Sequence, residues 1–194
     1  GVVGAVTDRM PKEESEARPE IVLAVSPLKN TGRYETMLEK AAELGVSLVI
    51  PLICARTEKT SVRADRARSI LVSAMKQSGR ATLTIMDDPT SFEAVIDTAA
   101  STPSIDGRFI CHEQMGPDAD LLGRVLRGEP TSSYLVLVGP EGGFTEDEMD
   151  RAIGAGFKPG SLGPLRLRTE TAAIVAATIV ARGSAVRETK GTPV

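Results

Sequence analysis

Short apolar runs alternate with longer segments of helical period along most of this sequence, and this alternation limits the folds that the chain can adopt. The runs with strand character cover residues 21–25, 46–52, 82–86, 108–111 and 133–138. The segments between them predict helices over 31–44, 64–78, 90–100 and 118–127. This order is typical of an α/β domain with a mostly parallel sheet and helices on both faces. Ligands of such domains bind beyond the carboxyl ends of the strands.

The last of these strands leads directly into the loop Gly139-Pro140-Glu141-Gly142-Gly143-Phe144. Its glycines allow the backbone to approach a bound molecule closely or to take a positive φ, and Pro140 stiffens the start of the turn. Thr145 and Glu148 follow with the three-residue spacing of a capping box, which predicts a helix over 145–155. A strand, a glycine loop and a capped helix in this order predict a ligand-binding loop.

A second loop, residues 161–168, repeats this design with Gly163 and Pro164 and leads into a helix predicted from Thr169 to Arg182. Two such loops, each followed by a helix, could enclose one small ligand.

The helix predicted from Thr169 to Arg182 has almost no polar face. Its apolar residues are Ala172, Ala173, Ile174, Val175, Ala176, Ala177, Ile179, Val180 and Ala181. A helix that is apolar all round is buried, so we expect the sheet on one side of it and a second subunit on the other. The alternative is the central helix of a monomer.

Composition excludes several classes of protein. No run approaches the ~20 apolar residues of a membrane span and no targeting pattern is visible, so we expect a cytoplasmic protein without a membrane partner. Cys54 and Cys111, with His112 as the single histidine, are too few for a disulfide scaffold or a four-ligand zinc site. We therefore expect no metal.

The net charge of −3 argues against a protein that coats nucleic acid non-specifically. Basic residues nevertheless concentrate in two segments, from Arg56 to Arg80 and from Arg151 to the end of the chain. If the two segments meet in the fold, they would form a positive surface able to hold phosphates. The alternative is a pair of solvated helix faces.

The loop sequences resemble the signature of the RsmE-type ribosomal RNA uridine-N3 methyltransferases, which are members of the SPOUT superfamily. The matching motifs are Gly139 to Phe144, Leu162-Gly163-Pro164 and Leu167 to Ala172. Further matches upstream are Lys40, Glu43-Leu44-Gly45-Val46, Pro51-Leu52, Arg56 and Gln77-Ser78-Gly79-Arg80. The resemblance spans about Ile21 to Arg182.

The resemblance implies an enzyme that transfers a methyl group from S-adenosyl-L-methionine to N3 of a uridine in small-subunit (16S) ribosomal RNA, leaving S-adenosyl-L-homocysteine. It also implies a SPOUT-type C-terminal trefoil knot (α/β knot) and a homodimer, with free ribosomal RNA or the assembled small ribosomal subunit as substrate. The cofactor-binding positions carried over are Ile110, His112, Leu137, Gly139, Pro140, Glu141, Gly142, Ser161, Leu162, Gly163, Leu165, Leu167, Thr169 and Thr171.

Arg168 is the first catalytic candidate, as a fixed cation near the uracil carbonyls, with an ion pair to Glu170 or Glu141 as the alternative. Glu170 is a candidate proton acceptor, although a carboxylate in the first turn of a helix often only satisfies backbone donors. A lone histidine such as His112 is more often structural than a catalytic base.

Arg56, Lys76 and Arg80 are the candidates for RNA phosphates, with solvated side chains as the alternative. The chain departs from the family pattern at Ala55, Ala67, Ser73 and Arg166. These departures affect the expected RNA contacts and remove no expected cofactor contact.

We expect residues 1–20 to be the remnant of an N-terminal PUA-like domain and its linker, and 21–194 to be the methyltransferase domain. Two rival functions remain open: an enzyme of the same fold that acts on another RNA, and a scaffold that binds the cofactor without catalysis.

Overall fold

A computed structural model describes residues 19–112 and 133–188. Nearly all of the segment 1–20 and the helix expected over 118–127 lie outside these ranges. In chain order the elements are β1 (Glu20–Val25), α1 (Thr31–Leu44), β2 (Leu48–Ile53), α2 (Ala64–Gln77), β3 (Ile85–Met86), β4 (Thr90–Ser91), α3 (Phe92–Ala100), β5 (Gly107–Cys111), β6 (Ser133–Val138), α5 (Glu146–Gly154), β7 (Lys158–Gly160) and α6 (Thr169–Glu188).

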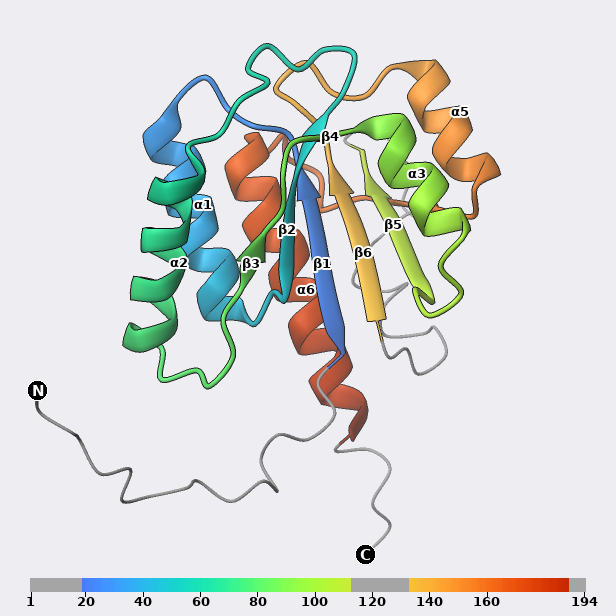
Figure 1. Ribbon diagram of the computed structural model, residues 1–194. Coiled ribbons are helices and arrows are strands. Elements are labelled where there is room, and N and C mark those ends of the chain that lie inside the picture. The colour runs from blue at the N-terminus through green and yellow to red at the C-terminus, as the bar shows by residue number, and fades with distance from the viewer. Residues whose placement is uncertain (1–18, 113–132, 189–194) are drawn as a thin grey trace, which may run out of the picture.

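The strands form one seven-stranded sheet in the order β3-β2-β1-β6-β5-β7, with β4 pairing with β2. Every pairing among the described strands is parallel. In Figure 1 the carboxyl ends of β1, β6 and β5 point to the same edge of the sheet. The predicted mostly parallel sheet is confirmed.

Alternate residues of the central strands face opposite layers of helices. Leu23 of β1 and Val136 of β6 belong to a core shared with α1, α2 and α6. Ala24 and Leu137, the next residue in each strand, belong to a second core that α3 and α5 cover. Because a strand alternates its side chains between the two faces, a strand that is buried on both faces reads as a continuous apolar run. Figure 1 shows these two layers of helices.

Three short elements differ from the prediction. The strand expected over 82–86 is reduced to Ile85–Met86. The helix expected over 90–100 begins at Phe92. Thr90 pairs with Leu52 in β4, and the cap is Ser91, whose Oγ accepts a hydrogen bond from Ala94 N at 3.2 Å. The strand β7 was not predicted because its sequence, Lys-Pro-Gly, has low strand propensity. It exists through its pairing with β5.

The other described elements agree with the sequence to within two residues, except that α6 continues to Glu188, beyond the end predicted at Arg182. The αL conformation of Gly45, with φ 94°, ends α1 as expected, and Gly156, with φ 87°, follows the end of α5.

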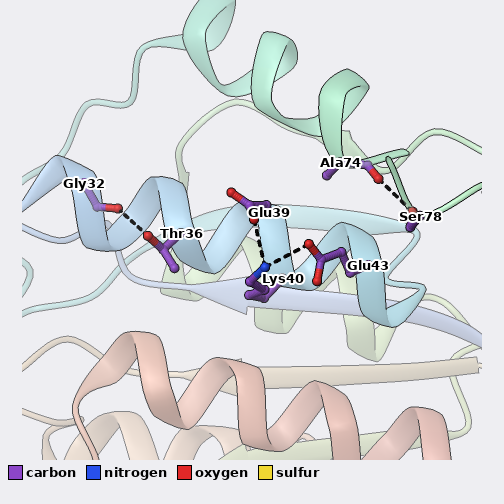
Figure 2. Close-up of polar contacts among 7 residues, drawn as sticks. All are labelled: Gly32, Thr36, Glu39, Lys40, Glu43, Ala74 and Ser78. Carbon is purple, nitrogen blue, oxygen red and sulfur yellow. Dashed lines mark hydrogen bonds and ion pairs between the residues drawn. The ribbon is translucent and has the colours of Figure 1, made fainter. Parts of the chain in front are cut away.

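Polar contacts line the outer surfaces of α1 and α2, as Figure 2 shows. Lys40 Nζ donates to Glu39 Oε1 at 2.8 Å and to Glu43 Oε1 at 2.9 Å, and these bonds raise the pKa of Lys40 to about 12. At the end of α2, the cap residue Ser78 donates from its Oγ to Ala74 O at 2.7 Å. This surface of α1 is therefore already occupied by charge pairs.

Only one face of α6 is fully buried within the chain. Ala173, Ala176, Ala177 and Val180 lie in the core against β1 and β6, whereas Val175 is half-buried and is not part of that core. Within the described residues, no helix combines the length and the apolar character needed to cross a membrane.

After β7, at the edge of the sheet, the chain returns to α6, which packs against β1, β6 and α1. The trefoil knot implied by the resemblance stays a prediction.

Candidate functional site

A cavity of about 850 Å³ lies at the carboxyl ends of β5 and β6, between the two loops identified in the sequence. Val138, Gly139 and Pro140 form part of its wall on one side, and Leu162 and Gly163 on another. The strands converge here because their ends are hydrogen-bonded to one another: Ser26 N donates to Val138 O and His112 N donates to Gly160 O, both at 3.1 Å.

The glycine loop folds back on itself around Phe144. Gly143 has φ +70°, and its N–H donates to Pro140 O at 2.9 Å, which closes a tight turn. The turn places the buried Phe144 ring against Gly139, where an added Cβ would lie 3.1 Å from the ring, and against Phe92 at a centroid distance of 5.8 Å. Gly139 is therefore needed for a close approach of backbone and ring.

Arg56 holds the other end of this loop. Its Nη1 donates to Gly142 O at 2.8 Å and to Phe144 O at 3.3 Å. A Cβ added to Gly142 would lie 3.3 Å from Cδ of the Arg56 side chain, so the two residues are in close contact. The sequence pointed to Arg56 as an RNA contact, and the structure places it on the cavity wall bound to the loop backbone.

Glu148 connects the start of α5 to the loop after β2. Its Oε2 accepts a hydrogen bond from Thr145 N at 2.8 Å, and Thr145 Oγ1 accepts one from Glu148 N at 3.2 Å, so the predicted capping box is confirmed. The second oxygen, Oε1, accepts a hydrogen bond from Ala55 N at 2.8 Å. A buried carboxylate thus satisfies backbone donors from two segments far apart in sequence.

The two loops are joined by a buried hydrogen bond in which Thr169 Oγ1 donates to Gly139 O at 3.1 Å. Thr169 begins α6 and Gly139 follows β6, so this bond fixes the start of the helix over the end of the strand. The convergence of the two loops that the sequence predicted is confirmed.

The cavity wall carries charged side chains of both signs. Arginines reach it from three elements: Arg33 from α1, Arg56 from the loop after β2, and Arg166 and Arg168 from the second loop. Acidic residues Glu141, Glu146 and Asp150 lie on the glycine loop and α5. The wall can therefore hold both an anionic and a cationic group.

Arg168 forms neither of the ion pairs considered for it. Its side chain is exposed, and in the described part of the chain it has no ion pair or hydrogen bond. Glu170 faces Arg33 instead, with 3.6 Å between Oε1 and Nε of the arginine.

Most of the predicted positions line the cavity, namely His112, Gly139, Pro140, Glu141, Gly142, Leu162, Gly163, Leu165, Leu167, Arg168 and Thr169. Ile110 and Leu137 do not, because both are fully buried in the core under α3 and α5. Glu170, Ser161 and Thr171 are also absent from the wall.

Sequence reasoning missed one whole face of the site. Glu146, Met149, Asp150 and Ile153 recur at the spacing of a single helix face and line the cavity from α5. This periodicity could have identified them. Arg33 was also missed, although it lies in the first turn of the helix that follows a strand end.

Lys76 and Arg80 lie at the opposite end of the sheet from the cavity, where α2 ends (Figure 1). Arg80 Nη1 donates to Ala42 O at 2.6 Å and to Thr84 Oγ1 at 3.1 Å, which ties the chain after α2 to the end of α1. The two basic segments therefore meet only in part, through Arg56, Arg166 and Arg168.

Neither cysteine is suited to nucleophilic chemistry. Burial raises the pKa of Cys111, which lies on the cavity wall, to about 12, and burial likewise raises the pKa of Cys54 to about 12. In residues 19–112 and 133–188, no group of three or more His, Cys, Asp or Glu side chains is placed to hold a metal ion.

A parallel sheet with a cavity at its carboxyl edge defines an α/β ligand-binding domain. Residues 15–181 match the family described as RNA methyltransferase domain, and the chain belongs to this family. A relative from Synechocystis sp. named ribosomal RNA small subunit methyltransferase E is 30% identical over 167 residues, which cover 84% of this chain and 54% of the relative. The chain thus spans about half the length of that relative.

Solved structures agree in sequence and in fold. A probable rRNA-methyltransferase from Porphyromonas gingivalis is 34% identical with a TM-score of 0.74, over 89% of this chain and 71% of that one. A ribosomal RNA small subunit methyltransferase E from Neisseria gonorrhoeae, bound to S-adenosyl methionine, is 31% identical with a TM-score of 0.69, over 90% of this chain and 68% of that one. These comparisons confirm the resemblance to the RsmE family and the SPOUT-type α/β fold.

The contact between Gly139 and Phe144 makes a testable prediction. Gly139→Ala places a methyl group 3.1 Å from a buried ring, so we expect the free energy of unfolding to fall by about 1–3 kcal/mol in urea titrations. Gly154→Ala is the control, because its added Cβ meets nothing within 4 Å and alanine favours helix; we expect stability unchanged or raised by up to about 1 kcal/mol. Equal effects of the two substitutions would show that the loop does not depend on this contact.

Proposed function

We propose that this protein is an S-adenosylmethionine-dependent methyltransferase that acts on N3 of a uridine in small-subunit ribosomal RNA. The observation that carries the proposal is the Thr169–Gly139 hydrogen bond, which joins both loops around one cavity. Membership of the RNA methyltransferase domain family supports the reaction, and the names of the relatives support the class of RNA.

The cavity fits S-adenosylmethionine in size and chemistry. Its volume of about 850 Å³ lies in the usual range of about 300–1,000 Å³ for small-molecule sites. Leu162, Leu165 and Leu167 offer an apolar wall for the adenine, and Leu165 is 77% exposed without such a cover. The backbone of Gly139 to Gly142 can read the polar edges, and Glu146 and Asp150 can attract the amino group.

Bound S-adenosylmethionine supplies a methyl group that is already activated on a sulfonium. The protein therefore has mainly to hold the uracil N3 in line with that methyl group and to favour the deprotonated base. Arg168 is suited to the second task, since its guanidinium is exposed at the cavity with no partner among the described residues. There it would stabilise negative charge on the uracil carbonyl oxygens.

We assign Arg56 a shaping role for the glycine loop, because its guanidinium already binds Gly142 O and Phe144 O. Lys76 and Arg80 would reach only RNA that extends to the opposite end of the sheet. Direct proton acceptance by Glu170 would require its carboxylate to turn from Arg33 to the cavity.

The proposal extends to the whole protein. We propose residues 21–194 as the methyltransferase domain, and the cytoplasm, with its ribosomal subunits, as the location.

Two measurements test the proposal against its rivals. We expect calorimetry to detect binding of S-adenosylmethionine and S-adenosylhomocysteine, and tritiated methyl groups to appear as 3-methyluridine in under-modified small ribosomal subunits. Binding without transfer would favour a scaffold, and transfer only to other RNA would favour a different substrate. Absence of both would refute the assignment.

Arg168→Ala tests the catalytic assignment. Because the lost cation acts on charge that develops during the reaction, we expect kcat to fall about 10²–10³-fold while the affinity for S-adenosylmethionine is retained. Arg151→Ala is the matched control, since Arg151 is exposed on α5 and paired with Asp97 at 2.8 Å. An unchanged kcat in Arg168→Ala would remove Arg168 from the mechanism.

We propose a homodimer in which the half-buried side of α6 packs against a second copy. We expect sedimentation equilibrium to give a dimer at micromolar concentration, and Val175→Glu to give a monomer because it places a charge on this apolar surface. Ser69→Glu, at an exposed position of α2, is expected to leave the dimer intact. A monomeric parent protein would contradict the proposal.

A further inference from the structure

Arg33 reaches the cavity from a part of the chain outside both ligand loops. It lies in the first turn of α1, where its backbone N–H donates to the cap residue Asn30 at 3.1 Å from Oδ1. The segment that follows β1 brings this turn to the carboxyl edge of the sheet, beside the start of α6 (Figure 1). The side chain lines the cavity and is 38% exposed, which places it where the cavity opens to solvent.

The carboxylate of Glu170, beside Arg33, is largely buried and has few polar partners. The Glu170 side chain is only 14% exposed, and its contact with Arg33 Nε is long, at 3.6 Å from Oε1. Its other oxygen, Oε2, is buried and accepts no hydrogen bond from any described residue. A carboxylate that is this buried and has one distant cation is poorly compensated, so it strongly favours a conformation that keeps Arg33 nearby.

Nothing else fixes the Arg33 guanidinium. In the described part of the chain, the contact with Glu170 is the only polar interaction of this side chain. Lys40, further along the same helix, differs because hydrogen bonds to Glu39 and Glu43 already engage it (Figure 2). Arg33 therefore keeps donors for a ligand, in an orientation that Glu170 sets.

The chemistry of this wall points to a phosphodiester. Arg33 and Arg168 line the same cavity, and arginine presents a planar set of donors that matches two phosphate oxygens. The acidic groups Glu146 and Asp150 belong to α5, on a different element. Arg33 also follows β1, whereas the loops proposed to hold the adenosyl group follow β6 and β7.

We propose that Arg33 binds a phosphodiester of the RNA substrate at the mouth of the cavity, and that Glu170 is a positioning residue that orients Arg33. This inference rests on the proposed function, in that RNA is the substrate. It gives Glu170 a role that acts through Arg33 and involves no proton transfer.

Filter binding of a radiolabelled, unmodified small-subunit rRNA transcript at several salt concentrations tests Arg33. Since Arg33→Ala removes one charge-assisted phosphate contact, we expect the Kd for RNA to rise about tenfold and the slope of log Kd against log salt to fall by about 0.7–0.9. Arg33→Lys should restore the slope with only part of the affinity, because lysine keeps the charge but not the planar donors.

Lys40→Ala is the matched control, since it removes one cation from the same helix that is already paired with carboxylates. We expect its RNA affinity and salt slope to match those of the parent protein. Calorimetry with S-adenosylmethionine should give the same Kd for the parent protein, Arg33→Ala and Lys40→Ala. Weaker cofactor binding by Arg33→Ala with an unchanged salt slope would instead assign Arg33 to the cofactor carboxylate and overturn the proposal.

Glu170→Gln separates positioning from proton acceptance. A positioning role predicts a higher KM for RNA with kcat retained, and no further change when Glu170→Gln is added to Arg33→Ala. A proton acceptor would lower kcat in both backgrounds, and that result would overturn the role given to Glu170.

The inference and the proposed function can fail separately. Filter binding needs no turnover, so an inactive protein that keeps the Arg33-dependent salt slope would refute the reaction only. An active enzyme whose salt slope is unchanged in Arg33→Ala would refute the inference only.

Discussion

The hydrogen bond from Thr169 Oγ1 to Gly139 O is the interaction on which the site depends. It joins two segments that the chain connects only by way of α5 and the edge strand β7. Since Thr169 and Gly139 are both buried, their polar groups need partners inside the protein, and each supplies the partner of the other. This bond fixes the start of α6 at the end of β6, and residues from both segments line one cavity. The cavity thus forms where two buried segments satisfy each other's hydrogen-bonding groups.

Around this bond, neighbouring side chains fix the loops by binding backbone atoms. Arg56 binds the carbonyl oxygens of Gly142 and Phe144, and Glu148 binds N–H groups of Thr145 and Ala55. The loop that follows β2 is therefore connected to the loop that follows β6 at two points, one cationic and one anionic. Such a framework suits a site whose ligand is read largely by backbone groups, because the positions of those groups are set before binding. Arg33 and Arg168 line the same cavity, and among the described residues neither side chain binds the backbone of these loops.

The net charge of the molecule does not predict the charges that line the cavity. A net charge of −3 disfavours non-specific binding to nucleic acid, yet arginines from α1, the β2–α2 loop and the second ligand loop converge at the cavity. Other cations are engaged elsewhere: Arg66 by Glu35, Arg151 by Asp97, and Arg80 by Ala42 O and the hydroxyls of Thr82 and Thr84. Arginine side chains thus gather at the cavity although the molecule is negative overall.

The sequence by itself determined the glycine loop, the capping box at Thr145 and most helices and strands, because each depends on residues close together in the chain. The alternation of these elements predicted the parallel α/β architecture. The sequence did not reveal β7, whose Lys-Pro-Gly sequence becomes a strand only through its partner β5. Nor did it place Arg33 at the cavity or Glu170 beside Arg33, since α1 and α6 lie more than a hundred residues apart in sequence and meet only through packing. The family resemblance placed Ile110 and Leu137 among the cofactor positions, and only the structure shows that the side chains of both lie in the core. Local pattern fixes an element and its ends, but only the tertiary structure decides which side chains share a wall, because that depends on contacts between distant segments.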